Sequence, residues 1–256
     1  MARTTRATGE ARPDALPPER RTVGQLVAES IRFYGSHFAR ALPLGLVVAG
    51  ANQASLGLGR EATTATLVLA APLFTLAFAY ASQLVGGSGQ TAPLRSWIVA
   101  LGAGTLVFVP AALLFPWFAL AGVLWLALAG LSVPVAILEH VTFAGSLRRG
   151  LALGRVDYVH AAGSLATLVI LFVLARLGLA LLLESQADNT VRVAVFLADA
   201  VIGPLLFLGG AILYVDQEAR LRSRERGKER RADLPDADDP DREGGPDAAR
   251  ESRPTA

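Results

Sequence analysis

The chain has 256 residues, of which 52% are hydrophobic and 18% charged, and most charges lie near the two ends. The segments between them include apolar stretches of ~18 residues or more, which would be apolar all round a helix, as in membrane spans and unlike a soluble core. The chain has no cysteine, which excludes disulfides, thiolate nucleophiles and cysteine-based metal sites.

The N-terminal residues predict an arm followed by an amphipathic helix. Residues 1–21 are rich in Pro, Arg, Thr and Ala and lack the apolar stretch of a secretory signal, so we expect a disordered arm. Residues 22–38 place apolar side chains on one helical face, which predicts a helix at the cytoplasmic interface. Thr22 and Gln25 have the spacing of a capping box. Alternatively, this segment is continuous with the first span.

Apolar segments then predict an all-α, polytopic membrane helix bundle of about six spans. The predicted spans are residues 41–59, 62–85, 97–114, 117–138, 159–183 and 191–215. The first is the weakest, because Asn52 and Gln53 lie within it. The uncharged stretch 98–138 would be ~60 Å long as one helix, twice the ~30 Å hydrocarbon core. We therefore expect a hairpin at residues 115–117.

Two further segments complete the domain organisation. Residues 142–157 alternate an apolar stripe with arginines and predict a second cytoplasmic amphipathic helix. The membrane domain then covers residues 22–216, and residues 217–256 predict a charged, largely disordered cytoplasmic tail. The two amphipathic segments also align at an offset of 120 residues, which suggests a parallel internal repeat.

Arginine placement predicts the orientation. With six spans, most arginines outside the spans fall on the side of the two termini, and only Arg60 and Arg192 fall in loops on the other side. The positive-inside rule makes the first side cytoplasmic. Removing the first span would divide the arginines between both sides, and this is the main support for counting it. Because the chain favours Arg, Ala and Gly, we expect a bacterial cell (inner) membrane.

Two ionic residues lie inside predicted spans. Arg176 in the fifth and Asp199 in the sixth would each lie ~10–12 Å below the outer surface, where they could pair. An unpaired charge there costs at least ~2.5 kcal/mol. The pair is either a clamp between two helices, which we favour, or a proton or ion relay.

Other candidate ionic residues lie at the cytoplasmic ends of spans. Glu139 is expected to pair with Arg148 or Arg149. Asp216 is either paired with Arg148, Arg149 or Arg155, which would lock two cytoplasmic segments together, or solvated where its helix leaves the membrane. We favour the lock.

The sequence offers little for catalysis. It contains no G-x-S-x-G or H-E-x-x-H pattern, and His37, His140 and His160 lack the spacing of metal ligands. The corner formed by Glu139 and His140 is the one candidate for a lipid-acting enzyme. We expect no enzymatic activity, no cofactor and no bound metal.

Three local patterns occur in a familiar order. They are FYGSHF at 33–38, PVAILE at 134–139 followed by SLRRGLALGR at 146–155, and Pro204 followed by LYVD at 213–216. Together they resemble the membrane domain associated with bacterial glycerophosphodiester phosphodiesterases, which also occurs alone in actinobacterial membrane proteins of unknown function. The similarity covers roughly residues 20–225. A catalytic barrel needs ~250 residues, and about 40 follow the last span, so the resemblance does not imply the enzyme's activity. The residues after Asp216 also depart from the family's basic pattern.

Three functions remain as hypotheses. The favoured one is a non-catalytic membrane scaffold or partner subunit, in contact with the bilayer, with anionic lipids and with another membrane protein. Basic cytoplasmic segments suit anionic lipid surfaces and do not indicate nucleic-acid binding. The alternative is a small transporter or channel that uses Arg176 and Asp199. A lipid-acting enzyme ranks last. The sequence does not indicate the oligomeric state.

Overall fold

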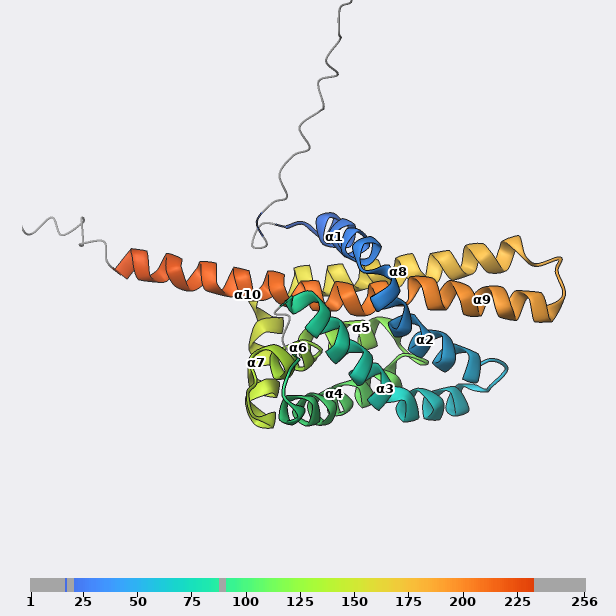
Figure 1. The fold of residues 1–256 in the computed structure, drawn as a ribbon, viewed down its shortest axis with the longest axis horizontal. Helices are drawn as coiled ribbons and strands as arrows, with labels where there is room; N and C mark the ends of the chain where they lie inside the picture. Colours follow the sequence, from blue (N-terminus) through green and yellow to red (C-terminus); the bar gives the residue numbers. More distant parts are fainter. Residues whose placement is uncertain (1–16, 18–20, 88–90, 233–256) are drawn as a thin grey trace, which may run out of the picture. The chain divides into compact units, whose positions relative to one another are not determined.

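The computed structural model describes residue 17 and residues 21–87 and 91–232. Every regular element in these residues is an α-helix, which confirms the all-α prediction. The helices are α1 (Val23–Ser36), α2 (Phe38–Ala54), α3 (Arg60–Gly86), α4 (Leu94–Leu114), α5 (Ala119–Ala129), α6 (Ser132–Leu138), α7 (Phe143–Val156), α8 (Tyr158–Leu182), α9 (Asp188–Ile202) and α10 (Pro204–Ala232). Figure 1 shows their arrangement.

Five helical segments of the described chain are long and apolar enough to cross a membrane. They are α3, α4, the α5–α6 pair (Ala119–Leu138), α8, and the α9–α10 pair over Asp188–Glu229. Large apolar side chains such as Leu69 and Leu182 are each 81% exposed, as expected for surfaces that face lipid. The chain is therefore a multi-pass helical membrane protein.

Helix α2 differs from the span that the sequence predicts at 41–59. It begins at Phe38 and ends at Ala54, and a turn leads to α3. Its 17 residues give a length of ~26 Å, which is shorter than the ~30 Å hydrocarbon core. Length alone therefore does not establish α2 as a span.

The other spans agree with the sequence in position but contain two unpredicted breaks. The expected hairpin lies between α4, which ends at Leu114, and α5, which begins at Ala119. The predicted fourth span breaks between α5 and α6, and the sixth breaks at Gly203. Pro204 begins α10, the position where a residue without an N–H group is tolerated.

Helices α1 and α7 lie at the positions of the two segments that the sequence predicts to be amphipathic. Thr22 and Gln25 form the complete capping box at α1, and the Thr142 side chain accepts a hydrogen bond from the backbone of Gly145 at α7. The bounds of α1 and α7 differ by the 120-residue offset, as do the first residues of α2 and α8, Phe38 and Tyr158. The start of the proposed repeat is thus present in the helix boundaries.

The buried face of α7 consists largely of small residues. Ser146, Gly150 and Gly154 are buried, and a Cβ on Gly150 or Gly154 would overlap Ser132 of α6 or the carbonyl oxygen of Leu128 in α5. This close packing leaves Arg148 and Arg155 exposed on the opposite side of α7. Figure 1 shows α7 running across the direction of α3 and α4.

Small residues also bring the membrane helices together, as is common in bilayers. A Cβ on Gly45 of α2 would overlap the carbonyl oxygen of Ala200 in α9. A Cβ on Gly203 would lie 3.2 Å from the Cα of Gly45. Helices α2 and α9 therefore cross at near backbone contact, and this crossing positions the polar cluster described below.

The last helix extends into the segment that the sequence predicts to be a disordered tail. Helix α10 continues through Asp216 to Ala232, so residues 217–232 are helical rather than disordered. The chain divides into two compact units, Met1–Leu221 and Arg222–Ala256. The predictions of disorder for residues 1–16, 18–20 and 233–256 lie outside the described residues.

Candidate functional site

The ionic residues inside the spans form a pair. Arg176 Nε of α8 lies 3.1 Å from Asp199 Oδ1 of α9. The Asp199 side chain is 1% exposed and that of Arg176 is 29% exposed. Asp199 is thus enclosed by protein, whereas the guanidinium reaches the surface of the helices.

Asn52 adds a third helix to this pair. Its Nδ2 donates a hydrogen bond of 2.9 Å to Asp199 Oδ2. The two carboxylate oxygens therefore face different partners, an arginine from α8 and an amide from α2. The crossing at Gly45 and Gly203 makes this contact possible, because it holds α2 and α9 close together one or two turns away.

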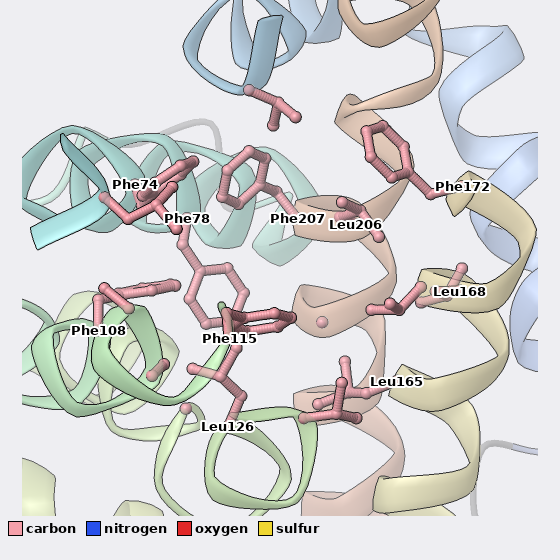
Figure 2. Close-up of a pocket in the computed structure, with 18 of the residues that line it drawn as sticks. Phe74, Phe78, Phe108, Phe115, Leu126, Leu165, Leu168, Phe172, Leu206 and Phe207 are labelled. Atoms are coloured by element: carbon pink, nitrogen blue, oxygen red, sulfur yellow. The ribbon is translucent and has the colours of Figure 1, made fainter. Parts of the chain in front are cut away.

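An apolar cavity of about 340 Å³ lies beside this cluster. Figure 2 shows aromatic side chains converging on it, and Phe74, Phe78, Phe108, Phe115 and Phe207 are among them. Apart from Asn52, every side chain that lines the cavity is apolar, or the residue is glycine. The sequence did not predict this cavity, because it is formed by residues scattered over α2, α3, α4, α5, α8 and α10.

The cavity and the polar cluster share part of their walls. Asn52 lines the cavity and bonds to Asp199. Phe172 of α8 also lines the cavity, and the Arg176 guanidinium lies 5.8 Å from the centre of its ring. A molecule in the cavity would therefore contact both a hydrocarbon wall and one amide.

A second ionic group lies at the ends of the spans that the sequence predicts to be cytoplasmic. Arg149 Nε lies 3.4 Å from Glu139 Oε2, which agrees with the expected pairing. The Tyr214 hydroxyl donates a 3.0 Å hydrogen bond to Glu139 Oε1. Glu139 thus connects α7 with α10, and Tyr214 is a partner that the sequence did not indicate.

The predicted partners of Asp216 were wrong. Asp216 is fully buried, and its Oδ1 lies 3.0 Å from Nη1 of Arg21, which precedes α1. Arg148 and Arg155 are exposed on α7 instead. The reason is the small-residue face of α7, which packs inward and leaves these arginines on the outer side of the helix.

A second ion pair lies next to the pair of Arg21 and Asp216. Arg220 Nη1 lies 2.7 Å from Asp157 Oδ2, and Arg220 Nη2 donates to the carbonyl oxygen of Arg21. Gln217 Nε2 donates to the carbonyl oxygen of Asp157. Asp216, Gln217 and Arg220 have helical spacing, so extending the buried face of the last span beyond residue 215 would have found them.

Comparisons with models of protein families, with curated proteins and with solved structures gave no match for this chain. The resemblance to the membrane domain of glycerophosphodiester phosphodiesterases therefore stays a prediction. Among the described residues, no group of three or more His, Asp or Glu side chains is placed to hold a metal ion.

Proposed function

We propose that this chain is a non-catalytic scaffold or partner subunit of a bacterial cell membrane, with six spans and both termini in the cytoplasm. This count adds α2, the first predicted span along the chain, to the five segments that are long and apolar enough to cross a membrane. Its support is the crossing with α9 and the bond from Asn52 to Asp199, which set α2 alongside a helix of an apolar span. The orientation rests on the arginines.

The main support for the proposal is the intramembrane cluster of Arg176, Asp199 and Asn52, in which protein side chains satisfy the buried carboxylate. Asp199 is enclosed by Arg176 and Asn52, each from a different helix. The neighbouring cavity has an apolar wall, whereas a proton or ion path needs water or polar groups in sequence. This arrangement favours a clamp that holds α2, α8 and α9 together over a relay.

The cytoplasmic face supplies a surface for a partner protein. Arg148 and Arg155 are exposed on α7, and the ion pairs between described residues do not involve either of them. Because α7 is fixed by close packing at Gly150 and Gly154, these guanidiniums are presented on a rigid helix. A membrane protein with an acidic cytoplasmic segment fits this surface.

Chemical crosslinking in native membranes, followed by purification in mild detergent, tests the proposal. We expect a reproducible protein partner whose recovery falls roughly tenfold when Arg148 and Arg155 are both changed to Glu. Arg192→Glu is the matched control, since Arg192 is exposed on α9, outside the cytoplasmic face. Absence of any partner, or equal loss with the control, would refute the scaffold.

A flux assay addresses the transporter alternative. Vesicles containing the Arg176→Met, Asp199→Asn double variant are compared with wild type for proton or ion conductance. Conductance that is present in wild type and absent in a stably folded double variant would replace the scaffold with a transporter. Equal conductance, or none in either protein, removes the relay.

A further inference from the structure

The apolar cavity extends over a length similar to the thickness of one bilayer leaflet, and it reaches from the outer half of the spans into the inner half. Along α3 it is lined from Leu67 to Phe78, which is a distance of ~16 Å on the helix axis. This is about half of the ~30 Å hydrocarbon core. On α8 and α10 the lining residues include Leu165 and Leu213, which lie toward the cytoplasmic ends of the spans.

The size of the cavity suits a hydrocarbon chain. It has a volume of about 340 Å³, and its lining is apolar apart from Asn52, so an extended acyl chain can occupy it. The volume is also at the small end of the range for binding pockets, ~300–1,000 Å³.

The surroundings of the cavity determine what fills it. Protein interiors are packed as densely as organic crystals, and apolar cavities exclude water. Val173 lines the cavity and is also 52% exposed on α8, in a segment apolar enough to cross the membrane. The cavity therefore reaches a surface that faces lipid, and lipid chains are the apolar molecules present there.

One polar residue, Asn52, lines the cavity, and Arg60 lies about two turns before the first lining residue of α3. The Asn52 amide donates one N–H to Asp199 and retains a second N–H for another acceptor. Beyond the α2–α3 turn, the Arg60 guanidinium lies 5.0 Å from the centre of the Trp117 ring. Stacked arginine and tryptophan suit the interfacial layer, where ester and phosphate groups of lipids are found.

We propose that the cavity binds one acyl chain of a phospholipid of the outer leaflet, with its ester carbonyl at Asn52 and its phosphate at Arg60. The chain enters past Val173 and lies among the phenylalanines of α3, α4 and α10. The guanidinium of Arg60 keeps its in-plane N–H donors while it stacks on Trp117. The bound lipid is then a structural part of the protein, since it fills space that side chains leave empty.

Photocrosslinking identifies the occupant. The full chain is reconstituted into phosphatidylethanolamine–phosphatidylglycerol vesicles containing phosphatidylglycerol with a diazirine in its acyl chain. We expect adducts on Phe78, which is buried (6% exposed) and lines the cavity, in addition to adducts on lipid-facing residues such as Leu69. Adducts confined to lipid-facing residues would overturn the proposal, without any variant being needed.

Two alanine variants provide a matched comparison. Ala112→Phe places a ring in the cavity and should reduce the Phe78 adduct roughly fivefold or more, whereas Ala65→Phe on the exposed face of α3 should not change it. Ala111→Val is the milder filling variant if Ala112→Phe does not fold. Equal adduct yields in wild type and a folded filling variant would exclude the cavity as the site.

Native mass spectrometry identifies the kind of lipid that supplies the bound acyl chain. We expect the purified protein to retain one phospholipid, and Arg60→Gln to lower the retained fraction roughly fivefold through loss of the phosphate contact. Retention of a polyprenyl lipid, or of detergent alone, would refute the phospholipid. Unchanged retention in Arg60→Gln would refute the placement of the phosphate.

Discussion

Neutralising the two charges of the intramembrane cluster, singly and together, gives a quantitative test of the clamp. Arg176→Met keeps a side chain of similar length and leaves the 1%-exposed Asp199 without its cation. Breaking a fully buried ion pair from one side costs ~3–5 kcal/mol. Because the Arg176 side chain is 29% exposed and Asn52 still donates to Asp199, we expect the free energy of unfolding to fall by about 2–3 kcal/mol.

The second single variant should cost less. Asp199→Asn retains an acceptor for Asn52, and the unpaired Arg176 can extend its flexible side chain toward the nearer membrane surface. We expect the free energy of unfolding to fall by about 1 kcal/mol. The double variant has neither charge, so it should be more stable than the sum of the single losses predicts, by about 2 kcal/mol.

Unfolding by sodium dodecyl sulfate from mild-detergent micelles measures these differences, with Arg192→Met as a control for loss of an exposed arginine on α9. The control should change stability by no more than ~0.5 kcal/mol. Additive losses in the double variant would show that Arg176 and Asp199 are not energetically coupled, and the clamp would then be rejected.

Three further changes test other contacts of the described structure. Gly45→Ala should destabilise the protein by about 1–3 kcal/mol because its Cβ meets the backbone of Ala200, whereas Gly50→Ala, with open space around it, should be neutral or stabilising in the same thermal melt. Asp216→Asn should lower the free energy of unfolding by about 1–3 kcal/mol, because it removes the buried charged partner of Arg21. An unchanged melting temperature would contradict a stabilising role for the pair of Arg21 and Asp216. A topology reporter fused at Gly59 should report the outer side of the membrane, and a cytoplasmic signal would remove α2 from the spans.

The sequence predicted the features that depend on local composition. Apolar length located α3, α4 and α8, and the spacing of Thr22 and Gln25 located the start of α1. The pairing of Arg176 with Asp199 followed from equal depth in consecutive helices. These inferences need only the rise of a helix and the cost of an unpaired charge in lipid.

Features that depend on the rotation of one helix against another were missed. Asp216 faces Arg21 rather than α7, because small residues decide which side of α7 is buried. Asn52 weakened the prediction of a span, yet it bonds to a residue far along the chain. The cavity could not be predicted either, since it arises where side chains from several helices fail to meet.

The bond between Asn52 and Asp199 also constrains how the protein is made. The two residues are 147 positions apart, which corresponds to roughly 7–30 s of synthesis at ~5–20 residues per second. During this interval α2, short and interrupted by a polar amide, has neither its partner across the Gly45 crossing nor an acceptor for Asn52. Helix α2 thus reaches its final position only after α9 is synthesised, so the first helix of the bundle is among the last to be secured.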